Sequence, residues 1–171
     1  MIIYRGRVTG LSDVSLARFV ARVRLAISLQ GLVNILITSS GEMKSLNRRF
    51  RGKDEPTDVL SFPSGAIDDC AGNDLAGEIA ISIEIARENG KRLGHSTPDE
   101  IKILILHGML HLAGYDHEAD LGKMALEEQR LRQLLGLPSG LIERNTANSK
   151  AIRRSPQPNS KITRGVARLK R

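Results

Sequence analysis

The sequence predicts an α+β domain followed by a disordered basic C-terminal tail. Its 171 residues are 40% hydrophobic and 26% charged, which is ordinary globular composition. Short segments rich in β-branched residues alternate with longer segments of helical periodicity, and this periodicity stops at Ser139. We therefore place the domain at residues 1–138 and the tail at residues 139–171.

Four short segments are predicted to be strands, because apolar and β-branched residues dominate them and turn residues border them. They are residues 1–9, 32–39, 57–63 and 78–83. Residues 51–56 form a turn before the third strand, and a polar loop at residues 64–75 separates the third strand from the fourth.

Five segments repeat apolar residues at helical spacing or begin with helix-capping residues. They are residues 11–31, 39–50, 83–94, 98–113 and 118–135. Ser39 with Glu42, and Thr97 with Glu100, match the Ser/Thr-x-x-Glu capping box, and Pro98 suits the first position of a helix. Glycines at the predicted ends allow the chain to leave each helix.

Charge is distributed unevenly along the chain. Residues 1–142 hold 17 basic and 18 acidic side chains, whereas residues 143–171 hold 9 basic side chains and one acidic side chain. The net charge of +7 therefore belongs to the tail. We interpret this segment either as a solvated tail or as an electrostatic arm for RNA phosphates.

The cellular setting is predicted from what the sequence lacks. Cys70 is the only cysteine, so an intramolecular disulfide cannot form and a reducing compartment is favoured. The chain has no apolar stretch of about 20 residues and begins without a signal-peptide pattern. These features predict a cytoplasmic protein with no membrane partner.

Three of the four histidines fall within eleven residues, in the pattern H-x-x-x-H-x-x-G-x-x-H. His107 and His111 project from the same face of the predicted helix, about 6 Å apart along its axis. Gly114 lets the chain turn back, so that His117 can supply a third nitrogen. Three histidines with an open fourth position are typical of a catalytic zinc site, with one Zn²⁺ per chain.

The same spacing occurs in zinc peptidases, which gives an alternative interpretation. Those enzymes carry a glutamate directly after the first histidine as the general base. Here that residue is Gly108, so a metallopeptidase-like hydrolase would need another base, such as Glu78 or Asp116.

Three sequence blocks together resemble the YbeY family of bacterial endoribonucleases and rRNA maturation factors. They are HGMLHLAGYDH at residues 107–117, LNRRFRGKDEPTDVLSFP at residues 46–63, and GEIAIS at residues 77–82. The resemblance implies a small mixed β-sheet of about four strands packed with helices, and a zincin-like site in which three histidines hold the metal. It implies a single-strand-specific, metal-dependent endoribonuclease in small-subunit rRNA 3′ end maturation and ribosome quality control. Single-stranded rRNA and the small ribosomal subunit are its expected partners.

The resemblance also assigns roles to individual residues. His107, His111 and His117 match the metal ligands, with His111 also counted as catalytic. Arg51 matches an arginine near the family's active site, where a guanidinium can bind a phosphate and act in catalysis. Glu78, where the family more often has aspartate, is a candidate for supporting a ligand histidine without binding the metal itself.

Several points stay open from the sequence. Asp116 is either a partner that orients a ligand histidine or a turn residue. The general base is Glu78, Asp116, a zinc-bound hydroxide or the 2′-OH of the RNA. A third function remains beside the nuclease and the peptidase, namely a non-catalytic zinc-stabilised ribosome-binding module.

Overall fold

The computed structural model describes residues 1–6, 8–64, 75–116 and 120–138. These residues form four strands and five helices. In chain order the elements are β1 (Ile2–Tyr4), α1 (Asp13–Ala26), β2 (Leu32–Thr38), α2 (Ser40–Arg51), β3 (Val59–Pro63), β4 (Leu75–Ser82), α3 (Ile83–Leu93), α4 (Thr97–Leu112) and α5 (Lys123–Leu135). Cys70 and the predicted tail at 139–171 lie outside the described residues.

The four strands form one mixed sheet in the order β1-β2-β4-β3. β1 pairs with β2 and β2 pairs with β4 in parallel, whereas β3 runs antiparallel to β4 at the edge. The predicted α+β class with a small mixed sheet is therefore confirmed. β4 begins at Leu75, inside the segment that we predicted to be a loop.

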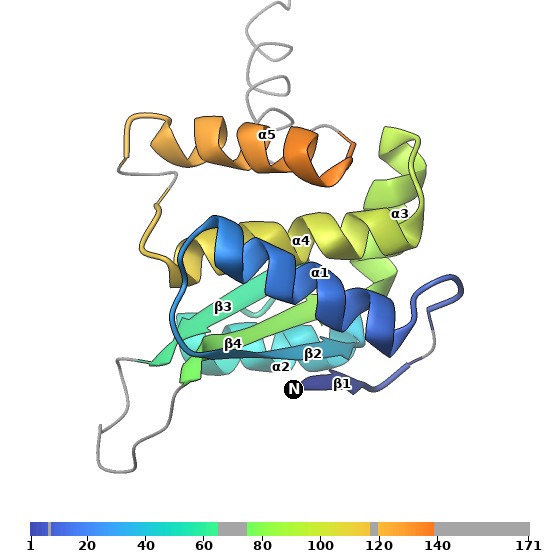
Figure 1. The fold of residues 1–171 in the computed structure, drawn as a ribbon. Helices are drawn as coiled ribbons and strands as arrows, with labels where there is room; N and C mark the ends of the chain where they lie inside the picture. Colours follow the sequence, from blue (N-terminus) through green and yellow to red (C-terminus); the bar gives the residue numbers. More distant parts are fainter. Residues whose placement is uncertain (7, 65–74, 117–119, 139–171) are drawn as a thin grey trace, which may run out of the picture.

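Helices cover both faces of the sheet (Figure 1). α1 and α4 lie on one face and α2 lies on the other, while α5 packs on α4 on the side away from the strands. The main apolar core fills the space between the sheet, α1 and α4, and a smaller cluster around Met43 and Leu60 lies under α2.

α4 is the central helix of the fold because it is apolar on nearly every side. Its residues from Ile103 to Leu110 are all buried. A helix of this kind needs neighbours all round, and α1, α3, α5 and two strands provide them. No helix in the described parts of the chain is both long and apolar enough to cross a membrane.

Gly108 explains how closely α4 approaches the sheet. A Cβ atom at this position would lie 2.9 Å from Ser61 Oγ and 3.0 Å from two side-chain atoms of Ile79. Contacts this short require the backbone or its neighbours to move, so the absence of a side chain allows the helix to rest on β3 and β4.

The start of α4 differs from the sequence prediction. The N-cap is Ser96, whose hydroxyl accepts a hydrogen bond from the Asp99 amide, and not Thr97. The Ser96 hydroxyl also donates to the Asp99 carboxylate, which lowers the pKa of Asp99. Glu100 does not close a capping box, because its buried side chain bonds the ring of His95.

α5 begins at Lys123, five residues later than predicted. Its N-cap is Gly122, which has no side chain to accept from the first turn. The carboxylate of Asp120 supplies this cap by accepting from the Gly122 and Met124 amides. The buried residues of α5 then lie on one side of the helix, facing the rest of the domain.

Candidate metal centre

His107 and His111 stand one turn apart near the end of α4, as the spacing predicts. Their rings meet edge to face, with centroids 4.8 Å apart and an angle of 79° between the planes. The two Nε2 atoms approach to 3.2 Å. The helix therefore brings one nitrogen from each ring to a common point.

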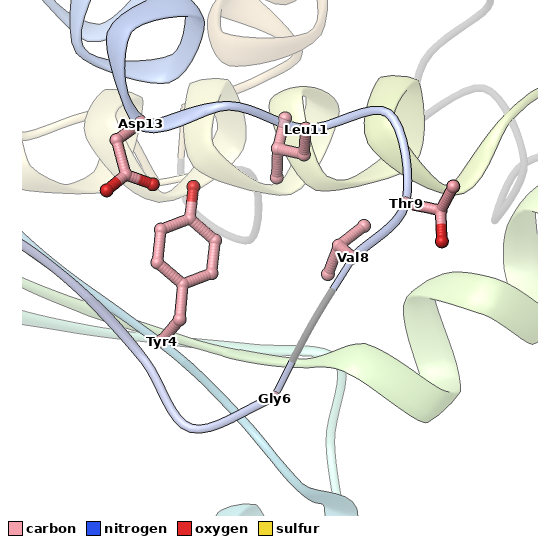
Figure 2. Close-up of a pocket in the computed structure, with 6 residues that line it drawn as sticks. All are labelled: Tyr4, Gly6, Val8, Thr9, Leu11 and Asp13. Carbon is pink, nitrogen blue, oxygen red and sulfur yellow. The ribbon is translucent and has the colours of Figure 1, made fainter.

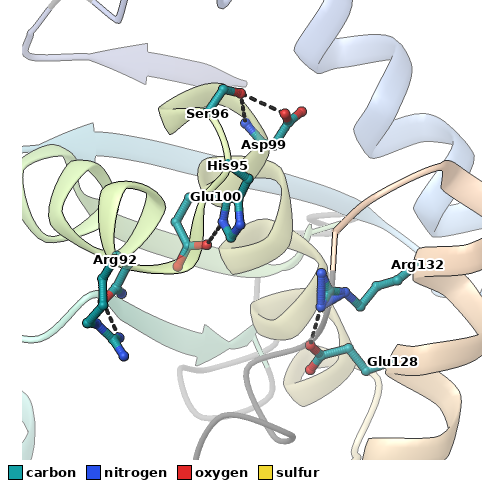
Figure 3. A network of polar contacts seen from close by, with 8 residues as sticks. Arg92, His95, Ser96, Asp99, Glu100, Glu128 and Arg132 are labelled. Carbon is teal, nitrogen blue, oxygen red and sulfur yellow. Dashed lines mark hydrogen bonds and ion pairs between the residues drawn. The ribbon is translucent and has the colours of Figure 1, made fainter.

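The other ring nitrogen of His107 has a carboxylate partner on α5. Its Nδ1 lies 3.0 Å from Oε2 of Glu128, and both residues are buried. On the far side of Glu128 the guanidinium of Arg132, one turn further along α5, stands 3.8 Å from Oε1. Figure 3 shows this Arg132–Glu128 contact together with the polar contacts at the start of α4.

His111 has a backbone partner that the end of α4 provides. The amide of Tyr115 donates to Leu110 O and the amide of Gly114 donates to His111 O, the two hydrogen bonds of a Schellman motif. Gly114 adopts φ +88°, a conformation that glycine reaches without strain. The motif reverses the chain and places the Tyr115 carbonyl 2.9 Å from Nδ1 of His111.

These partners fix the chemistry of the two Nε2 atoms. A carbonyl oxygen only accepts hydrogen bonds, so Nδ1 of His111 donates to Tyr115, and opposite an ionised Glu128 the Nδ1 of His107 donates in the same way. Both Nε2 atoms then present lone pairs to each other at 3.2 Å, and two neutral rings cannot form a hydrogen bond in this arrangement. A cation shared by the two Nε2 atoms would use both lone pairs.

A zinc ion fits this donor pair. Two ligands at about 2.0–2.1 Å from a tetrahedral zinc are separated by about 3.3–3.4 Å. The observed separation of 3.2 Å between the Nε2 atoms of His107 and His111 is close to this value. Nδ1 of each histidine also contacts an oxygen, of Glu128 or of Tyr115. A hydrogen bond from the second ring nitrogen to an oxygen is usual for metal-bound histidine.

The third predicted ligand, His117, lies outside the described residues. Within the ranges that the structure describes, His, Cys, Asp and Glu side chains form no group of three that could hold a metal ion. Asp116, directly before His117, is exposed, and its carbonyl accepts from the Asp120 amide at 2.9 Å.

The structure places Glu78 and Arg51 across the sheet from the histidine pair. On β4, Ile79 faces Gly108 of α4 and Ala80 packs with Met43 under α2, so neighbouring residues alternate between the faces. Glu78 therefore shares the α2 face, and its carboxylate accepts from the amide of Asn34 at 3.2 Å.

Arg51 is the last residue of α2, and its side chain is exposed. The preceding residue, Phe50, packs edge to face on Phe62 of β3 with ring centroids 5.0 Å apart. This contact fixes the end of α2 against the edge strand. The structure thus brings His107 and His111 together, while Arg51 and Glu78 belong to other elements on the opposite side of the sheet.

Glu128 is the residue at this site that the sequence analysis missed. A signal was present, because Met124, Glu128 and Leu131 repeat at helical spacing and all three are buried. A glutamate on an apolar stripe is rarely buried without a partner. That position alone would have marked Glu128 as paired.

A second histidine and carboxylate pair lies at the other end of α4. Nε2 of His95 is 2.6 Å from Oε2 of Glu100, and both side chains are buried (Figure 3). His95 is outside the three-histidine motif and lies in the α3–α4 connection, but its ring is inside the protein.

A cavity of about 290 Å³ lies between β1 and the start of α1 (Figure 2). Tyr4, Thr9 and Asp13 supply its polar side chains, and burial followed by the charge of Asp13 raises the pKa of Tyr4. Gly10 beside this cavity lies against Pro98, in the first turn of α4. The cavity is therefore near the end of α4 opposite to His107 and His111.

Comparison with known proteins gives a consistent result. Residues 14–136 match the family model described as Endoribonuclease YbeY. The chain is 53% identical over 150 residues to Endoribonuclease YbeY of Koribacter versatilis, covering 88% of this chain and 95% of that protein. It is 46% identical over 143 residues to Endoribonuclease YbeY of Solibacter usitatus, covering 84% and 92%. The solution structure of TM1509 from Thermotoga maritima matches with a TM-score of 0.53 and 28% identity, covering 94% of this chain and all of that one.

Proposed function

The chain belongs to the Endoribonuclease YbeY family, and on this premise we propose that it is a single-strand-specific, metal-dependent endoribonuclease. Its proposed substrate is the 3′ region of small-subunit rRNA. The small ribosomal subunit is the proposed partner, in rRNA maturation and in ribosome quality control, and the cytoplasm is the proposed location.

One observation carries the metal dependence. The Nε2 atoms of His107 and His111 converge at 3.2 Å while each Nδ1 is engaged by an oxygen. This arrangement leaves two lone pairs that a cation can share. His117 would complete the site, since it is the second residue after Tyr115, whose carbonyl contacts His111.

Zinc held by these histidines would supply a Lewis acid for the phosphoryl group and an acidified water molecule. The protein residues would do the rest. His107 and His111 hold the ion on the rigid end of α4, and Tyr115 keeps the His111 ring in place through its carbonyl. Asp116 remains a candidate for moving a proton, because it is exposed and adjacent to this loop.

Arg51 is proposed to bind the phosphate at the scissile bond. Its guanidinium is exposed and can form two parallel hydrogen bonds to phosphate oxygens. The packing of Phe50 on Phe62 holds the end of α2, which limits the positions that Arg51 can reach.

The packing of Gly108 weighs against the peptidase alternative. The base of a zinc peptidase occupies this position, and here even a Cβ would lie 2.9 Å from Ser61 Oγ. Glu78 is on the opposite face of the sheet from Ile79 and bonds Asn34, so it is a poor substitute for that base.

The test incubates the zinc-loaded full chain with labelled single-stranded rRNA, with the same RNA in a duplex, and with casein. We expect cleavage of the single strand alone. Arg51→Ala should lower the cleavage rate by about 10²–10³, the usual effect of removing one charge-stabilising donor, with zinc content unchanged. Arg87→Ala, an exposed arginine on α3, is the matched control and should cleave normally.

Two results would overturn this function. Casein hydrolysis that disappears in His111→Ala would establish a peptidase. Zinc bound at one ion per chain without cleavage of RNA or casein would establish the non-catalytic module.

A further inference from the structure

We propose that Glu128 is a positioning residue of the metal centre, which sets the protonated nitrogen of His107 and so keeps Nε2 available to the metal. This inference rests on the proposed metal site. It adds a residue on α5, outside the histidine motif, to the set that metal binding requires.

The first argument is burial. Glu128 is 1% exposed, and a buried carboxylate loses its hydration unless hydrogen-bond donors replace the water. The neighbouring residue Glu127 shows the ordinary alternative, since it lies at the surface side of the same helix. Its carboxylate takes two hydrogen bonds from Arg130 at 2.6 and 2.9 Å.

The second argument compares the partners of Glu128. Arg132 is 3.8 Å from Oε1, beyond hydrogen-bond distance, whereas Nδ1 of His107 is 3.0 Å from Oε2. The carboxylate of Glu128 therefore lies closer to His107 than to Arg132. A residue buried only to neutralise Arg132 would be expected to bond the guanidinium directly.

The third argument is the direction in which Nε2 of His107 points. Because Glu128 accepts from Nδ1, the lone pair of the His107 ring is at Nε2, and this atom faces Nε2 of His111. A carboxylate on a ligand histidine also raises the electron density of the ring, which strengthens its bond to a metal. The position and the charge of Glu128 thus act in the same direction.

The primary test is Glu128→Gln in the full chain. Arg132 should attract the amide oxygen, leaving the amide NH₂ toward Nδ1 of His107 and forcing the proton to Nε2. We expect zinc affinity to fall by about 10–100-fold, measured by competition with a chromogenic chelator at one fixed pH. Long-range ¹H–¹⁵N spectra of the zinc-free protein should show His107 changing from the Nδ1–H to the Nε2–H form.

Glu127→Gln is the matched control, because it makes the same change one residue away and should retain wild-type zinc affinity. If Glu128→Gln does not fold, the double variant Glu128→Met with Arg132→Met replaces the buried charges by apolar groups, which proteins often tolerate. It should bind zinc at least tenfold more weakly than the wild type.

Wild-type zinc affinity in either folded variant would overturn the proposal, even if the melting temperature falls, because the role of Glu128 would then be structural. The zinc affinity of the unmodified chain is measured first. Absence of zinc binding by the unmodified chain would reject the metal site itself. Zinc binding by the unmodified chain with unchanged affinity in the variants would reject only the role of Glu128. Neither measurement depends on RNA cleavage.

Discussion

The two ends of α4 each have a buried histidine paired with a glutamate, yet in the part of the chain that the structure describes only the pair at the C-terminal end has a histidine nitrogen facing a second histidine. At the start of the helix Glu100 contacts Nε2 of His95 at 2.6 Å. Near the end Glu128 contacts Nδ1 of His107 at 3.0 Å and leaves Nε2 directed at His111. A buried histidine and carboxylate therefore do not make a metal centre. We expect metal binding to depend on two further features: which ring nitrogen the carboxylate contacts, and whether a second histidine lies one turn away.

The largest expected effect is a difference in zinc content between variants at the two ends of α4. His111→Ala removes one of two converging nitrogens and should reduce zinc from about one ion per chain to none, measured by elemental analysis. His95→Gln keeps a donor for Glu100 and should retain full zinc content. Zinc loss in His95→Gln, or zinc retention in His111→Ala, would reverse the assignment of the two ends.

An intermediate effect is expected where the C-terminal half of α4, which carries the proposed metal site, touches the sheet. Gly108→Ala inserts a methyl group 2.9 Å from Ser61 Oγ and should lower the free energy of unfolding by about 1–3 kcal/mol, measured by urea denaturation. Zinc stoichiometry should stay the same, because His107 and His111 project from another side of the helix. A stabilised Gly108→Ala protein would contradict the close packing described here.

The smallest effect on the metal centre is expected from the tail, which is proposed to act on RNA alone. Residues 143–171 carry 9 basic side chains. If they engage about four phosphates, they contribute about −3 to the slope of log affinity against log salt. Truncation after Ile142 should flatten that slope in filter-binding assays while zinc content stays unchanged. Equal slopes for the two proteins would leave the tail as a solvated segment.

The sequence predicted the features that depend on local spacing. The i, i+4 spacing of His107 and His111 places their rings side by side on a helix, and Gly114 marks the reversal that follows. The β-branched segments likewise located all four strands. The mixed sheet was predicted from the family resemblance, because the sequence of one strand does not show whether its neighbours run parallel or antiparallel to it.

Features that depend on tertiary packing could not be predicted in the same way. Glu78 and Ile79 are adjacent, but opposite faces of a strand meet different helices, and only the fold decides which face meets α4. Ser96 and Thr97 are both residue types that cap helices, and in the structure Ser96 is the cap while Glu100 is buried against His95. Cap position and strand face are thus set by contacts distant in sequence.

The hydrogen bond from His111 to the Tyr115 carbonyl has a consequence for variation among related chains. A main-chain oxygen is present whatever side chain occupies position 115, so substitutions there cannot delete this support. The hydrogen bond depends instead on Gly114, whose φ of +88° sets the direction of the Tyr115 carbonyl. A mutational scan scored by zinc content would therefore find residue 114 more sensitive than residue 115, even though the Tyr115 side chain packs against the apolar core.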